Sequence, residues 1–156
     1  MRIKRVYIDT SVVGGYFDKE FKVPTRALFK LVENRDLIFV TSDLMELELN
    51  EAPQNVRQLL HRFPDECFEK IAMTNEAFIL AEKYISENVV GKASIEDCRH
   101  IALATIYKVD VLISWNFKHI VNLERIKGYN SVNLKLGYPF IEIRSPREIL
   151  HYENLE

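Results

Sequence analysis

Four polar side chains that suit a metal-dependent reaction are spread along this sequence. They are Asp9, Glu48, Asp97 and Asn116. Carboxylates that converge in a fold repel one another, and they stay ionised together only beside a cation. Hard cations such as Mg²⁺ and Mn²⁺ take oxygen ligands, whereas no His/Cys cluster here has the spacing of a zinc site. These residue types therefore predict a Mg²⁺ or Mn²⁺ site, provided that the fold brings them together.

Each of these residues also has a structural explanation. Asp9 precedes Thr10 and Ser11 and makes a good helix N-cap, so the local sequence leaves cap, metal ligand and catalytic base all open. Asp97 lies three residues after Ser94 in a cap-like S-x-x-D arrangement, where the helix dipole favours an acid. Asn116 alone is typical of a turn. The choice among these roles depends on which other side chains the fold brings close to each residue.

The second acid of the site must be either Glu46 or Glu48. Side chains that are two positions apart on a helix point about 200° away from each other, so only one of Glu46 and Glu48 can face a given site. Glu46 lies three residues after Asp43 and completes a capping box, which explains it without a site. Glu48 has no such role, so we prefer Glu48 and keep Glu46 as the alternative second acid.

The elements that must position these residues alternate between strands and helices. Strands are predicted over residues 3–8, 37–40, 68–72, 109–114 and 140–143. Helices are predicted over residues 10–17, 25–33, 43–50, 53–61, 75–87, 94–108 and 117–126, with a short one opening at 145–148 and a loop over 128–137. This alternation predicts an α/β fold with a mostly parallel sheet, in which ligands bind at the carboxyl ends of the strands.

Length and composition set the broad class of protein. A chain of 156 residues, 47% hydrophobic and 28% charged, predicts a single globular domain over residues 1–156. No apolar run approaches the roughly 20 residues that span a bilayer, and no signal peptide is visible, so we expect a cytoplasmic protein without membrane contact. The net charge of −2 gives no basic bias towards nucleic acid, although acids gathered in one site would mask a basic rim.

Four segments in order resemble the PIN-domain family, and within it the VapC-like toxins. They are VYIDTS at 6–11, TSDLMELEL at 41–49, SIEDCRHIA at 94–102 and VLISWNFKH at 111–119. The resemblance implies a PIN-like three-layer α/β/α sandwich, with a mostly parallel central sheet of four or five strands. It also implies a Mg²⁺- or Mn²⁺-dependent endoribonuclease that is the toxin of a type II toxin–antitoxin module.

The same resemblance assigns roles to the site residues. Asp9, Glu48 and Asp97 would be the three metal-binding acids, and Asn116 stands where many members carry a fourth acid. Ser11 or Thr10 would support the first acid. The neutral amide at position 116 removes one negative charge, so the alternative is a catalytically weak or inactive PIN-like domain that binds RNA or protein.

The expected partners follow from the same resemblance. They are an RNA substrate, a protein antitoxin and a second copy of the chain, and the helices 25–33 and 53–61 are the first places to look for a dimer interface. The residues expected to contact the substrate are Ser11, Lys92, Arg99 and Lys118. A small-molecule binding domain is disfavoured, because Gly14-Gly15 lacks the G-x-G-x-x-G phosphate loop.

Overall fold

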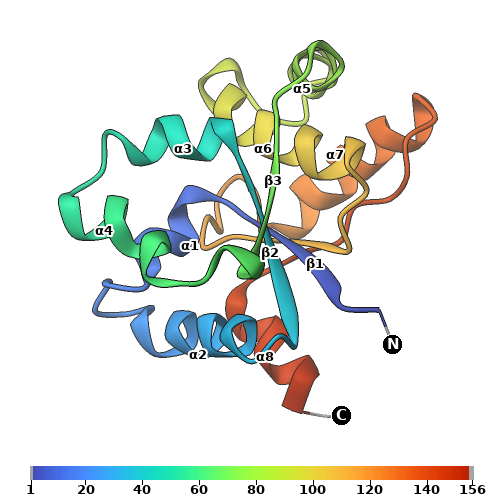
Figure 1. The fold of residues 1–156 in the computed structure, drawn as a ribbon. Coiled ribbons are helices and arrows are strands. Elements are labelled where there is room, and N and C mark those ends of the chain that lie inside the picture. Colours follow the sequence, from blue (N-terminus) through green and yellow to red (C-terminus); the bar gives the residue numbers. More distant parts are fainter. Residues whose placement is uncertain (1, 155–156) are drawn as a thin grey trace.

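A parallel sheet of five strands forms the centre of the molecule (Figure 1). The structure is a computed structural model that describes residues 2–154. The strands are β1 (Lys4–Ile8), β2 (Leu37–Ser42), β3 (Phe68–Ile71), β4 (Val111–Ile113) and β5 (Ile143–Arg144). They lie in the order β3-β2-β1-β4-β5, and all four neighbouring pairs are parallel. The chain therefore reverses its direction of winding between β1 and β4, and such a switch point is where parallel sheets bind ligands.

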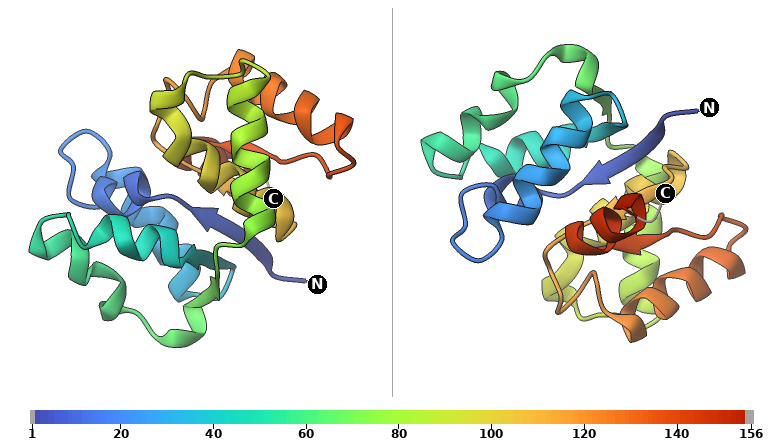
Figure 2. Two further views of the ribbon diagram at one scale, coloured as in Figure 1. Left: turned by 90° about the horizontal axis from the view of Figure 1, so that it is seen from above. Right: turned by 90° about the horizontal axis from the view of Figure 1, so that it is seen from below.

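Helices cover both faces of the sheet. They are α1 (Thr10–Gly15), α2 (Lys22–Glu33), α3 (Asp43–Leu49), α4 (Gln54–Gln58), α5 (Asn75–Ser86), α6 (Ile95–Ile106), α7 (Leu123–Lys135) and α8 (Pro146–Asn154), with short 3₁₀ turns at Leu59–Arg62, Asp65–Cys67 and Lys92–Ser94. Figure 1 shows α5, α6 and α7 above and α2 and α8 below, and Figure 2 shows the molecule from these two sides. In the part of the chain that the structure describes, no helix is long and apolar enough to cross a membrane.

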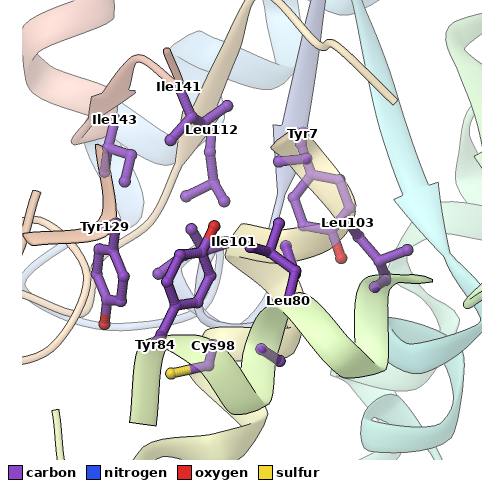
Figure 3. Close-up of a cluster of buried hydrophobic side chains, with 14 of the residues drawn as sticks. Tyr7, Leu80, Tyr84, Cys98, Ile101, Leu103, Leu112, Tyr129, Ile141 and Ile143 are labelled. Carbon is purple, nitrogen blue, oxygen red and sulfur yellow. The ribbon is translucent and has the colours of Figure 1, made fainter. Parts of the chain in front are cut away.

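Alternating side chains of the strands feed two separate cores. In β1, Tyr7 faces the core under α5, α6 and α7, whereas Val6 and Ile8 face the core under α1 and α2. Figure 3 shows Tyr7 entering the first core beside Leu103, among residues of the sheet and of α5, α6 and α7. Burial of both faces explains why the strands read as continuous apolar runs. The predicted α/β/α sandwich is confirmed, with five strands that are all parallel.

Two stretches of the predicted secondary structure are wrong. The strand predicted over 140–143 lies later and is shorter, since β5 covers only Ile143–Arg144. The predicted helix over 117–126 and loop over 128–137 are replaced by a turn and then α7, which starts at Leu123 and runs through the supposed loop. Asn122 caps this helix by accepting a hydrogen bond from the Arg125 amide. Asn130 and Asn133 favoured a loop because asparagine often bonds its own backbone. Here they are buried and bond distant partners instead, the Ile141 backbone and the Tyr84 hydroxyl.

Candidate active site

Asp9 lies at the switch point of the sheet, directly after β1. Its side chain is 5% exposed, and its two oxygens accept hydrogen bonds from the hydroxyls of Ser11 and Ser114, both at 2.6 Å. Ser114 follows β4, so the two strands that flank the switch point hold this carboxylate between them. Asp9 occupies the N-cap position of α1, but its side chain does not cap the helix. A capping role therefore does not explain it.

Within residues 2–154, Asp9 and Asp97 form no ion pair with a lysine or arginine. Burial raises the pKa of Asp9, and the nearby His100 and the serine hydroxyls oppose this rise only in part. Burial and the charge of Asp9 likewise raise the pKa of Asp97, and His100 and His119 oppose this rise only in part. The carboxyl end of the sheet thus concentrates negative charge that the nearby imidazoles offset only in part.

The capping explanation of Asp97 does not hold either. The Ser94 amide donates to the Gly91 carbonyl at 3.0 Å, and the Ser94 hydroxyl makes no capping bond to α6. The Asp97 carboxylate instead accepts a hydrogen bond from the side-chain amide of Asn116 at 3.3 Å. The structure therefore directs Asp97 to the end of β4, beside Asp9, rather than back onto its own helix.

Asn116 turns its nitrogen, not its oxygen, towards the acids. Its side-chain oxygen accepts from the backbone amides of Lys118 and His119, at 3.1 and 3.0 Å. Those amides can only donate, which fixes the oxygen on the loop side and leaves the NH₂ group for Asp97. The amide oxygen that the sequence offered as a fourth ligand is thus occupied. In this geometry Asn116 orients Asp97 by donating a hydrogen bond to it.

Glu48 reaches the same end of the sheet from α3. One of its oxygens accepts hydrogen bonds from the Thr10 hydroxyl at 2.5 Å and from the His100 ring at 2.6 Å. Thr10 is next to Asp9, and His100 is one turn after Asp97 on α6. Glu46 is exposed and lies 3.9 Å from the amine of Lys70 on the outer side of the helix. Of the two candidate second acids, Glu48 is thus the one whose side chain extends towards Asp9.

A buried hydrogen-bonded chain behind Glu48 was not anticipated from the sequence. The other ring nitrogen of His100 lies 2.6 Å from the Tyr7 hydroxyl, which lies 2.8 Å from the hydroxyl of Ser42. Burial opposes a charge on His100, but Glu48, Asp9 and Asp97 outweigh it and raise the pKa of His100. Burial would also raise the pKa of Glu48, yet the bonds from His100 and Thr10 lower it. Glu48 is therefore held in place by Thr10 and His100, and its charge favours the protonated form of the imidazole.

The donor set fits a divalent cation with few protein ligands. Within residues 2–154, no three His, Cys, Asp or Glu side chains are arranged so that they could hold one ion together. Mg²⁺ does not require such a cage, because it keeps several waters and binds through one or two carboxylates together with substrate phosphates. Asp9 and Asp97 would be those two carboxylates, and Glu48 adds a third negative charge that is held by His100.

The residues expected to contact the substrate separate into two groups. Ser11 belongs to the site, where it supports Asp9 and also accepts the Trp115 amide at 2.9 Å. Lys92 and Lys118 are both exposed; Lys92 lies in the turn before α6, and Lys118 lies two residues after Asn116. Arg99 instead pairs with Glu96 at 2.6 Å and lies over the Phe78 ring. Its charge is therefore already partnered, unlike those of the two lysines.

Known proteins resemble this chain in fold but not in sequence. No family model and no curated protein matches it. A DNA-bound VapBC structure from Salmonella typhimurium has a TM-score of 0.57 at 17% identity, covering 93% of this chain and 99% of the other. VapBC2 from Rickettsia felis, bound to a promoter DNA fragment, has a TM-score of 0.56 at 11% identity, with 90% and 98% covered.

A third structure carries a more specific description. VapC20 from Mycobacterium tuberculosis, described as a toxin that cleaves the sarcin–ricin loop, has a TM-score of 0.56 at 11% identity and covers 72% of this chain and 91% of its own. At such identities the likeness concerns the fold alone. The chain therefore has the PIN-domain fold of the VapC toxin structures.

Proposed function

We propose that this protein is a Mg²⁺- or Mn²⁺-dependent endoribonuclease, the toxin of a toxin–antitoxin module. The observation that carries the proposal is the pair Asp9 and Asp97. They are acids with raised pKa values at the switch point of a PIN-type sheet, and neither forms an ion pair with a lysine or arginine of the described chain. An unbalanced carboxylate pair is costly unless a cation completes it. The VapC20 neighbour, a toxin that cleaves RNA, has the same fold.

The roles of the side chains follow from their contacts. Asp9 and Asp97 would hold the ion, with Asp9 fixed by its two serines and Asp97 by Asn116. A bound Mg²⁺ or Mn²⁺ would activate a water and offset the charge that develops on the phosphate. Glu48 adds a negative charge whose position is fixed by Thr10 and His100. Lys92 and Lys118 are exposed and would attract the RNA phosphates.

A protein antitoxin and a second copy of the chain complete the proposal. Two of the structural neighbours are VapBC complexes, which are bound to DNA. The apolar stripes of α2 and α4 face the chain's own core, so they are poor candidates for an interface. Leu47 and Phe78 are exposed instead, and they line a pocket of about 420 Å³ that also includes Glu48. A partner seated there would block the site.

The test is RNA cleavage by the purified protein with Mg²⁺ or Mn²⁺. We expect the wild-type protein to cut, and Asp9→Asn and Asp97→Asn to lose at least about 10³-fold in rate, because each removes a charged ligand of the ion. Asp36→Asn, an exposed acid before β2, is the matched control. Cleavage that is equal in wild type and both variants, or that persists in EDTA, would refute the proposal.

A second function is supported by Asn116. Its NH₂ group faces Asp97 where a fourth acid would otherwise add charge, and this weakens the demand for a metal. The corresponding candidate is a PIN-like domain that binds RNA or protein without cutting. RNA binding that survives Asp9→Asn, in a wild-type protein that never cleaves, would favour this candidate over the nuclease.

A further inference from the structure

Beside the acids, arginine side chains lie over aromatic rings rather than against carboxylates. We call this the aromatic–arginine surface and define it by Phe21, Trp115, Phe117, Arg26 and Arg147. The Arg147 guanidinium lies 5.1 Å from the centre of the Trp115 ring and 5.6 Å from that of Phe21. That of Arg26 lies 4.8 Å from the Tyr16 ring, and its Nε donates to the Tyr16 carbonyl. These contacts fix both arginines in place.

Arg26 and Arg147 form no ion pair within the part of the chain that the structure describes. Elsewhere in residues 2–154, Arg5, Arg35 and Arg144 each form an ion pair with an acid. Arg26 and Arg147 are both exposed. An ordered guanidinium that lacks an acidic partner is suited to a phosphate, which it can bind through two parallel hydrogen bonds.

The aromatic rings form a rigid base with one exposed member. Phe21 stacks on Trp115 with ring centres 4.1 Å apart, and the indole donates to Thr25, so Trp115 is used in packing. Gly15 permits this, because a Cβ there would lie 2.6 Å from the indole nitrogen. Phe117 packs edge-on against Trp115 with ring centres 6.0 Å apart, yet it remains 47% exposed. Its position is therefore fixed while part of its ring faces solvent.

This surface is continuous with the acid site. The Trp115 amide donates to the Ser11 hydroxyl, which itself donates to Asp9. Phe117 directly follows Asn116, whose amide contacts Asp97. The residues that follow β4 therefore contact the acid site through their backbone and through Asn116, and they also carry Trp115 and Phe117 of the aromatic–arginine surface.

We propose that the aromatic–arginine surface is a subsite for an unpaired stretch of RNA, with a base stacked on Phe117 and neighbouring phosphates on Arg147 and Arg26. This inference rests on the proposed function and adds that the cut lies beside an unpaired nucleotide. An exposed aromatic ring accepts the face of any base, whereas the faces of paired bases are hidden in the stack. Aromatic rings combined with unpaired cations are the usual means of holding single-stranded nucleic acid.

The test measures binding separately from cleavage. Asp9→Asn protein is titrated against a labelled, non-self-complementary RNA and against the same RNA annealed to its complement, with fluorescence anisotropy as the readout. Adding Phe117→Ala should weaken binding of the single strand by about 5- to 100-fold. Phe117→Trp should keep it within about 2-fold, and Phe140→Ala, which removes another exposed phenylalanine, should leave it unchanged. Arg147→Gln should lower the salt slope by about one.

The outcomes separate this inference from the proposed function. If the wild type cleaves RNA but Phe117→Ala binds and cleaves normally, the subsite is refuted and the nuclease stands. If no variant cleaves but single-strand binding still depends on Phe117, the subsite stands and the nuclease is refuted. Equal affinity for duplex and single strand would overturn the inference. So would a Phe117→Ala protein that changes only its oligomeric state, because the surface would then be a protein interface.

Discussion

Acidic side chains at the two ends of the sheet have opposite surroundings. At the amino end, where the strands begin, Asp110 accepts hydrogen bonds from Arg2 at 2.6 and 3.0 Å and from the Arg5 amide at 2.7 Å. Glu69 binds the Arg5 guanidinium through both oxygens at 2.7 Å. At the carboxyl end, Asp9 accepts hydrogen bonds from the hydroxyls of Ser11 and Ser114 and has no lysine or arginine among its described donors.

The pKa values reflect this difference. Burial would raise the pKa of Asp110, but its bonds to Arg2 and the Arg5 amide lower it, and the Arg5 guanidinium lowers the pKa of Glu69. Burial raises the pKa values of Asp9 and Asp97. The same residue type thus favours the folded chain at one end of the sheet and opposes it at the other. Because the acids at the carboxyl end oppose folding, their presence needs a reason other than stability, such as the binding of a cation.

Glu48 is the exception that tests this contrast, because it lies at the carboxyl end and has a basic partner. We expect Glu48→Gln to reduce RNA cleavage by about 10- to 100-fold, since the site loses a charge and His100 loses its counter-ion. Glu46→Gln should stay within about 2-fold, because Glu46 contacts only Lys70 on the far side of α3. Initial cleavage rates of the two variants make the comparison. The reverse order would mean that Glu46 is the second acid.

Stability offers a matched pair of substitutions with opposite expected signs. Asp110→Asn should lower the free energy of unfolding by about 1–2 kcal/mol, because it weakens the contact with exposed Arg2 and the bond from the Arg5 amide. Asp9→Asn should raise it by up to about 1 kcal/mol without metal, because it removes a buried charge and keeps a polar group for the serines. Urea unfolding in EDTA measures both. A destabilised Asp9→Asn protein would show that Asp9 is a structural anchor.

Asn116→Asp would sharpen the contrast by adding a further acid at the carboxyl end. The new carboxylate can still accept the Lys118 and His119 amides, but it would present its second oxygen to Asp97 in place of the NH₂ group. We expect Mn²⁺ to bind about 10-fold tighter and the metal-free protein to melt at a lower temperature. Calorimetric titration with Mn²⁺ measures this affinity, and Asn55→Asp, at an exposed position of α4, is the control. Unchanged affinity would place residue 116 away from the ion.

The layout of the fold was predictable because most of its signals are local. Continuous apolar runs predicted the central strands, and the chain order of strands and helices predicted the parallel sandwich that the structure confirms. The failure at α7 has a tertiary cause, since Asn130 and Asn133 bond Ile141 and Tyr84 from distant parts of the chain. Periodicity contains no information about such partners.

The candidate site shows the same division. Helix phase predicted that only one of Glu46 and Glu48 would face the site, because it follows from residue spacing alone. The capping box predicted for Asp43 and Glu46 does not form, because Ser42 rather than Asp43 caps α3 and Asp43 accepts the Met73 amide instead. The partners of these acids could not be read in the same way. Tyr7 reads as an ordinary strand residue, and its bond to His100 spans 93 positions of the chain. The orientation of the Asn116 amide depends on loop geometry that no spacing reveals. A buried strand tyrosine, which needs a partner for its hydroxyl, was the one available signal.

The dependence of stability on pH is the smallest expected effect, and it compares both ends in one experiment. Asp110 and Glu69 have lowered pKa values, so their contribution is complete above the unfolded values of about 3.9–4.3 and is lost as the pH falls through the folded values. Asp9 and Asp97 have raised pKa values, so their penalty is complete above the folded values and disappears as the pH falls towards about 3.9.

These opposite signs predict a stability maximum in mild acid for the metal-free protein. As the pH falls from neutral, Asp9 and Asp97 take up protons first and the free energy of unfolding rises by about 1 kcal/mol or less. Below about pH 4 the pairs at the amino end are lost and it falls. Urea unfolding from pH 3 to pH 8 should show a smaller rise in an Asp9→Asn/Asp97→Asn double variant than in wild type, while the acid-side fall persists in both. Part of the rise remains in the variant because Glu48 still raises the pKa of His100. A double variant that keeps the whole rise would assign it to groups other than Asp9 and Asp97.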